Sequence, residues 1–129
     1  MNRALELHRS KLAAVVASRE SVILKLRPAH VLESNGLCGV DQGRAVAQDI
    51  DVTFGGARLV RRQGPLPDAI GEAALLLADK AQPHPLRLPL RFKGVIELRL
   101  RTAGGGEVLL VAGWAESTLV GSASPVGEV

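Results

Sequence analysis

The chain has 129 residues, of which 47% are hydrophobic and 22% charged, a balance typical of one soluble globular domain rather than of a disordered chain. Aromatic residues make up only 2%, which argues against modules that stack sugars or single-stranded nucleic acid on aromatic rings. The single cysteine, Cys38, excludes an intramolecular disulfide and a multi-cysteine metal site, and the apolar runs are too short for a membrane helix.

The net charge is +3, but the charged residues are distributed unevenly. Residues 58–101 hold nine Lys or Arg against four Asp or Glu, whereas residues 34–57 and 102–129 hold more acidic than basic residues. This asymmetry indicates either a surface that attracts an anionic partner or the solvent-facing sides of strands. The N-terminus has no signal-peptide pattern, so we expect a cytoplasmic protein, and the free cysteine fits a reducing compartment.

Residues 2–18 predict an N-terminal α-helix. Leu5, Leu12 and Val15 recur at a spacing close to 3.6 residues, and Val16 falls on the same side. Because this apolar stripe is narrow, we expect the helix to pack on a sheet edge or on a partner subunit.

From residue 22 the hydrophobic period changes from 3.6 to two. Residues 22–31 predict a strand, and Pro28 within it indicates an edge strand or a bend. Residues 33–44 contain three glycines and predict a loop, the longest irregular stretch of the chain and therefore a candidate functional segment. Residues 45–54 alternate clearly and predict a second strand.

The next segment, residues 57–62, predicts a strand that follows a bulge or turn at Gly55-Gly56. Residues 68–80 fit either a helix capped by Asp68 or a buried strand, and the strands on both sides favour the strand. Residues 86–101 are the most regular part, with apolar residues alternating with basic ones. The expected elements that follow are a hairpin turn at 103–106, strands at 107–114 and 117–120, and a flexible tail at 122–129.

These elements predict a mainly β fold, an antiparallel β-sandwich or barrel-like domain of about seven strands with one N-terminal α-helix. The domain would span residues 1–121, with the helix at 2–18 and the β domain at 20–121.

We predict no catalytic residues and no cofactor. Cys38 could pair with one of three histidines, His8, His30 or His84, but no cysteine-hydrolase signature surrounds it. The strongest metal candidates lie in or beside the long loop, although their spacing fits no standard motif. They are His30, Cys38, Asp41 and Asp49.

Basic residues on the predicted strands form a candidate anion-binding face if those strands are neighbours. The modest net charge and the lack of stacking rings argue against nucleic acid as the partner. The main residues of this face are Arg87, Arg91, Lys93, Arg99 and Arg101, and Arg58, Arg61 and Arg62 are further members.

The sequence therefore predicts a non-enzymatic binding or assembly module that forms a homo-oligomer, because small β domains often cover their edges by association. One alternative is a small metal-dependent protein or enzyme that uses the 30–49 region. The other alternative is anion or nucleic-acid binding on the arginine-rich face. No membrane partner is expected, and the sequence does not tell whether a small-molecule ligand binds.

Overall fold

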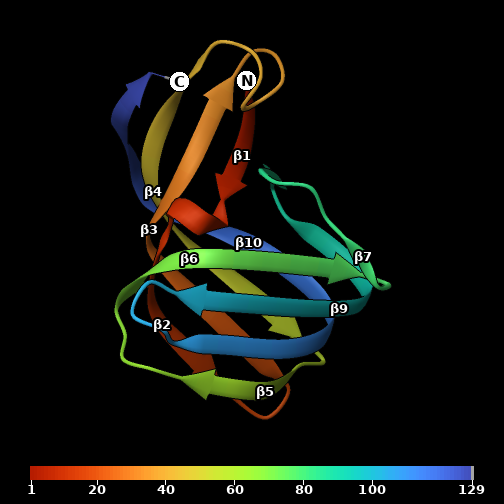
Figure 1. Ribbon diagram of the computed structural model, residues 1–129. Helices are drawn as coiled ribbons and strands as arrows, with labels where there is room; N and C mark the ends of the chain where they lie inside the picture. The colour runs from red at the N-terminus through yellow and green to blue at the C-terminus, as the bar shows by residue number, and fades with distance from the viewer. Residues whose placement is uncertain (129) are drawn as a thin grey trace.

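The computed structural model describes residues 1–128, which form one antiparallel sheet of ten strands and one short 3-10 turn, η1 (Figure 1). The predicted mainly β, antiparallel chain is confirmed, but the structure has ten strands rather than seven. The elements are β1 (Asn2–Glu6), η1 (Leu7–Arg9), β2 (Lys11–Ala17), β3 (Ser21–Ser34), β4 (Gly43–Gly55), β5 (Arg58–Gln63), β6 (Asp68–Leu77), β7 (Lys80–Ala81), β8 (Leu86–Leu88), β9 (Arg91–Thr102) and β10 (Glu107–Glu128).

Six strands close into a ring, which we call the barrel lobe. β2, β6, β9, β10, β4 and β3 pair in this order, and β3 pairs again with β2. β5 adds to β10, and β7 adds to β6, outside this ring.

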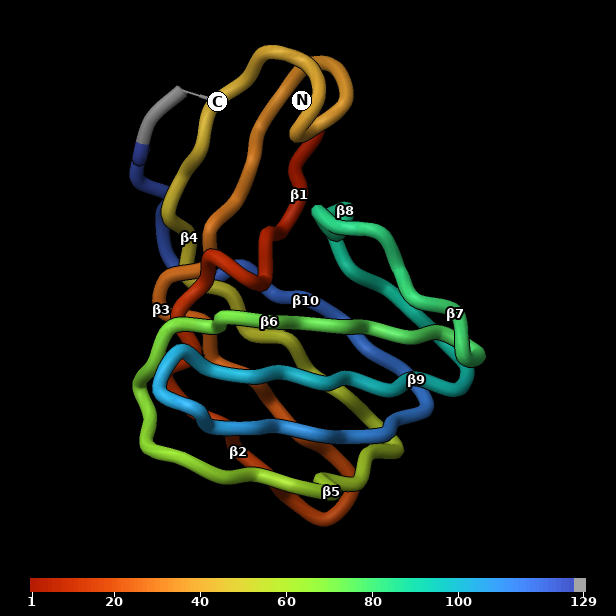
Figure 2. The backbone as a smooth tube through the Cα atoms, viewed as in Figure 1, coloured from red at the N-terminus to blue at the C-terminus, as the bar shows by residue number. Residues whose placement is uncertain are grey.

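A second unit, which we call the open lobe, lies beyond the ring (Figure 2). It contains the far halves of β3, β4 and β10, together with β1 and β8, in the order β8, β1, β3, β4 and β10. Among residues 1–128 no ladder joins β10 back to β8. The open lobe therefore has two sheet edges.

Alternation of apolar and polar residues along the strands builds one core, as the sequence predicted. Inward-facing side chains of β4 and β9 are buried, whereas Arg99 and Arg101, which alternate with them, are exposed. The inward-facing set in these two strands is Ile50, Val52, Phe54, Ile96, Leu98 and Leu100.

The predicted N-terminal α-helix at 2–18 is wrong, because β1, η1 and β2 occupy this segment. Leu5 and Leu12 are buried, but on two strands that both pair with β3. Along each strand, side chains on one side of the sheet recur at every second residue. The 3-10 turn between the strands offsets the second series from the first, so the apolar residues of the whole segment recur at a spacing close to that of a helix. Val16, which the helix would have buried, is exposed. Among residues 1–128 no helix has the length and apolar character needed to cross a membrane.

Pro28 lies where β3 passes from one lobe to the other. β3 pairs with β2 through residues 22–26 and with β1 through residues 30–34, and its register with β4 shifts between Leu26 and Ala29. Proline donates no N–H to a ladder, so it fits this break. The predicted bend is confirmed, but β3 is an inner strand with neighbours on both sides rather than an edge strand.

Several element boundaries in the structure also differ from those predicted. The loop predicted at 33–44 is shorter, because β3 ends at Ser34 and β4 begins at Gly43. The segment 68–80 holds β6, which agrees with the favoured strand interpretation. Residues 122–128, predicted as a flexible tail, belong to β10, which pairs with β4 again at 124–128, and Val129 lies outside the described residues.

Candidate functional site

All three histidines of the chain lie around Glu6, at the junction of the two lobes. Glu6 Oε1 lies 3.2 Å from His30 Nδ1, and Glu6 Oε2 lies 3.4 Å from His8 Nε2. The His84 ring packs edge-on against the His8 ring, with their centroids 6.3 Å apart. We call Glu6, His8, His30 and His84 the histidine cluster. Its members come from β1, η1, β3 and the β7–β8 loop.

The backbone beneath the histidine cluster is held by Ser10, a buried residue. Its hydroxyl donates to the Glu6 carbonyl oxygen at 2.8 Å and accepts from the His30 N–H at 3.0 Å. The Ser10 carbonyl oxygen accepts from the Ile70 N–H of β6 at 2.9 Å. Ser10 therefore ties the end of β1 to β3 and β6, and it helps to keep Glu6 opposite His30, its partner in the β1–β3 ladder.

Two ring nitrogens of the cluster, His30 Nδ1 and His84 Nε2, are buried without a hydrogen-bond partner. His30 Nδ1 is near enough to Glu6 for electrostatic attraction, but the two are not aligned as a hydrogen bond. Burial, and then the electrostatic effect of the neighbouring His8, lower the pKa of His84 below its usual value of 6.5, against a smaller opposite effect of Glu6. His84 is therefore neutral at pH 7.

The four metal candidates predicted from the sequence are not brought together. His30 belongs to the histidine cluster, Asp41 accepts a hydrogen bond from the Leu37 N–H in its own loop, and Asp49 lies in β4 opposite Val120. As the side chains stand, no group of three or more His, Cys, Asp or Glu within residues 1–128 has the geometry to hold a metal ion.

Cys38, the fourth candidate, lies in a cleft of about 470 Å³ between the 35–42 loop, β1 and the segment around β8. Its Sγ lies 3.4 Å from the carbonyl oxygen of Asn2 and 3.6 Å from that of Leu32, where a thiol can donate. His84 lines the same cleft, but no hydrogen bond joins it to Cys38 among the described residues. This arrangement gives no activated nucleophile of the Cys–His type.

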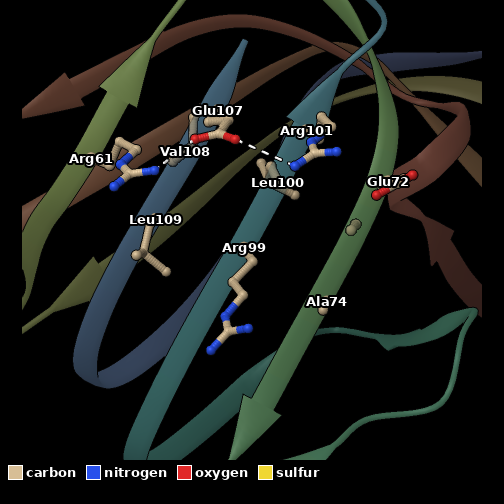
Figure 3. Close-up of a pocket in the computed structure, with 10 residues that line it drawn as sticks. Arg61, Glu72, Ala74, Arg99, Leu100, Arg101, Glu107, Val108 and Leu109 are labelled. Atoms are coloured by element: carbon tan, nitrogen blue, oxygen red, sulfur yellow. Dashed lines mark hydrogen bonds and ion pairs between the residues drawn. The ribbon is translucent and has the colours of Figure 1, made fainter. Parts of the chain in front are cut away.

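Arginine side chains do gather on the outer surface of the barrel lobe, over β5, β10, β9 and β6 (Figure 3). Glu107 lies between Arg61 and Arg101, at 3.1 and 3.4 Å, and Arg99 pairs with Glu97 at 2.9 Å. The depression over these strands has a volume of about 410 Å³.

Carboxylates neutralise much of this arginine surface. The hydrogen bond from Arg61, supported by the charges of Arg61 and Arg101, lowers the pKa of Glu107, so its carboxylate stays ionised at neutral pH. Glu72 lines the same depression from β6. The predicted anion-binding residues are also divided, because Arg87 lies on β8, Arg91 and Lys93 at the start of β9, and Arg99 and Arg101 near its end.

The outer edge of β10 in the open lobe is unpaired. Within residues 118–126, the residues at 118–120 and 124–125 pair with β4, the ladder is interrupted between Val120 and Ser124, and no strand among residues 1–128 pairs on the other side (Figure 1). Leu119 and Val126 are exposed there, and no charged residue occurs between Ser117 and Gly127. A groove of about 510 Å³, lined in part by Met1, Leu88 and Leu119, runs beside this edge.

Glu6, His8 and His84 were not predicted as partners of His30. On the predicted helix, residues two apart such as Glu6 and His8 point in different directions, and no spacing in the sequence relates them to His84. Only the pairing of β1 with β3, and the return of the β7–β8 loop, bring the four residues to one place.

Comparison of the chain with protein-family models, with curated proteins and with solved structures found no match in any of the three.

Proposed function

We propose that this protein is a non-enzymatic β module that self-associates through the outer edge of β10, residues 118–126. The observation that carries the proposal is that this edge has unpaired backbone groups and no charged side chain. Native proteins usually protect such an edge, because its free N–H and C=O groups bind another strand. The same edge of a second copy carries the N–H and C=O groups that can pair with it.

The edges at β5, β7 and β8 are better protected than this one, and the unpaired side of β2 is shorter, because it spans only residues 13–17. β8 has three residues and lies between Pro85 and Pro89, and β7 has two residues. β5 carries three arginines in six residues, and these repel a second copy of the same strand. β10 therefore has the longest uncharged run without a strand on its outer side among the described residues, which favours it as the edge that associates.

The shape of the open lobe supports a symmetric dimer. Two copies of this edge can pair antiparallel across a two-fold axis, although the strand is irregular between Val120 and Ser124, where Gly121 has a φ of 69°. The groove beside the edge offers the incoming copy apolar surface from Met1 and Leu119 and basic surface from Arg3 and Arg87. Pro125 has no N–H to donate, so we expect the intermolecular ladder to lie mainly at residues 118–124.

Anion binding on the arginine face is a weaker candidate. Arg61, Arg99 and Arg101 already contact Glu97 or Glu107, so a polyanion would have to displace these ion pairs.

The proposal is tested by light scattering on size-fractionated protein over a range of concentrations. We expect the wild-type chain to dimerise and Leu119→Lys to weaken the dimer at least about tenfold, because it places a charge on the edge. Val95→Lys is the matched control, since Val95 is 71% exposed but lies on β9, an inner strand of the barrel lobe. A monomeric wild-type chain at every concentration, or a Leu119→Lys dimer as tight as that of Val95→Lys, would overturn the proposal.

A further inference from the structure

We propose that Glu6, His8, His30 and His84 bind a divalent transition-metal ion of the Zn²⁺ class. The first reason is that two buried ring nitrogens in this cluster, His30 Nδ1 and His84 Nε2, lack hydrogen-bond partners. They are the only buried side-chain nitrogen or oxygen atoms without one among the described side chains. Buried polar atoms nearly always have a hydrogen-bond partner. Two buried nitrogens without one in the same cluster therefore indicate a ligand that binds their lone pairs.

The second reason is the spacing of the donor atoms. In a tetrahedral zinc site with bonds of about 2.0–2.1 Å, neighbouring ligand atoms lie about 3.3–3.4 Å apart. The His30 Nδ1 to Glu6 Oε1 separation is 3.2 Å, and the His8 Nε2 to Glu6 Oε2 separation is 3.4 Å. Each of two imidazole nitrogens therefore lies, from one oxygen of the Glu6 carboxylate, at about the distance that separates two ligand atoms of one zinc ion.

Completing the site requires small movements of exposed or loop side chains. His8 meets one carboxylate oxygen and His30 the other, so the His8 ring, whose side chain is 45% exposed, has to turn toward a common point. His84 lies in the β7–β8 loop and lines the 470 Å³ cleft, and its ring also has to turn toward this point. Arg9 Nε, 3.7 Å from Glu6 Oε2, has to leave the carboxylate, and its side chain is 61% exposed.

The donor set selects the class of metal. Three imidazoles and one carboxylate suit zinc and its transition-metal neighbours, whereas magnesium and calcium prefer oxygen ligands. Coordinated imidazole is neutral, so binding releases any proton that these rings hold at the metal-facing nitrogen. The backbone under Glu6 and His30 is fixed by Ser10, which supplies a rigid base for two of the four ligands.

Equilibrium dialysis of the metal-stripped chain against zinc chloride, followed by metal analysis, tests the proposal. We expect one zinc per chain, and a four-coordinate spectrum when cobalt(II) replaces zinc. Glu6→Gln and His84→Ala are each expected to weaken zinc binding by about 100-fold or more, beyond the 10–100-fold typical for loss of an outer partner.

Asp41→Asn and Cys38→Ser are the controls, because they remove donors of the 35–42 loop without touching the cluster. Circular dichroism checks that each variant is folded, and His8→Ala, at an exposed side chain, replaces any cluster variant that is not. Absence of zinc from the wild-type chain would overturn the proposal, and so would wild-type binding by Glu6→Gln and His84→Ala. Loss of zinc in Cys38→Ser alone would place the metal in the loop and also overturn it.

This inference does not rest on self-association. All four ligands come from one chain, so monomeric Leu119→Lys protein is expected to bind zinc as tightly as the wild type.

Discussion

Ser10 shows how much a single small side chain contributes to this fold. Its hydroxyl donates one hydrogen bond to Glu6 and accepts one from His30, and its carbonyl oxygen accepts from Ile70. Serine at a buried position between charged residues carries no pattern in the sequence, so its role is visible only once β1, β3 and β6 meet.

We expect Ser10→Ala to lower the free energy of unfolding by about 1–3 kcal/mol, the cost of leaving a buried polar group without its partner. The His30 N–H is that group. Chemical denaturation followed by circular dichroism measures the change. Ser18→Ala is the matched control, because the Ser18 hydroxyl bonds Ser21 at an exposed site, and a change within about 0.5 kcal/mol is expected there. Equal effects of the two substitutions would show that Ser10 has no special role.

At the scale of elements, the open lobe is joined by an ion-pair ladder across three strands. Glu33 of β3 lies directly opposite Arg3 of β1 and Arg44 of β4 in the two ladders. Its oxygens accept from Arg3 Nε at 2.9 Å and from Arg44 Nε at 2.7 Å, while only 3% of its side chain is exposed. A buried carboxylate between two arginines holds β1 and β4 on either side of β3.

Glu33→Gln is expected to destabilise the protein by about 1–3 kcal/mol. Hydrogen bonds to charged groups contribute about 1.5–3 kcal/mol each, and the value is discounted here because both arginines are about half exposed. Hydrogen exchange should show the loss of protection at residues 2–6 and 43–47, around the substituted site. Glu116→Gln, at an exposed carboxylate, is the control, and an unchanged exchange pattern in Glu33→Gln would contradict the prediction.

For the whole molecule, the two lobes share their longest strands. β3, β4 and β10 each run through both the barrel lobe and the open lobe, so neither lobe has a sheet of its own. Trp114, the only tryptophan, lies in the barrel lobe, opposite Gly55 in the β10–β4 ladder, and a Cβ on Gly55 would overlap its ring. Its fluorescence therefore reports on the barrel lobe.

We expect thermal unfolding to be a single transition, with the same midpoint by Trp114 fluorescence and by far-ultraviolet circular dichroism. Glu33→Gln, in the open lobe, should lower the midpoint seen by Trp114 as well, because the shared strands couple the lobes. A Trp114 midpoint unaffected by Glu33→Gln, or two separate transitions, would mean that the lobes unfold independently.

The parts of the fold that the sequence predicted are those governed by local alternation. β4, β9 and the hairpin turn before β10 follow from apolar residues at every second position and from glycines between them. The N-terminal helix was wrong because a turn between two strands reproduced helical spacing. Of the candidate site, only His30 was predicted as a metal ligand, and His8 and His84 were named only as possible partners of Cys38. Glu6, His8 and His84 come from segments that no local pattern relates to His30.

The sequence by itself determined that this chain forms antiparallel strands with one apolar side, because burial of alternate side chains depends only on near neighbours along the chain. Tertiary structure alone decided how the strands close into a barrel lobe and leave an open lobe, since that depends on which distant strands pair. It also decided that Glu6 and three histidines meet, because their proximity is set by the β1–β3 register and by one returning loop.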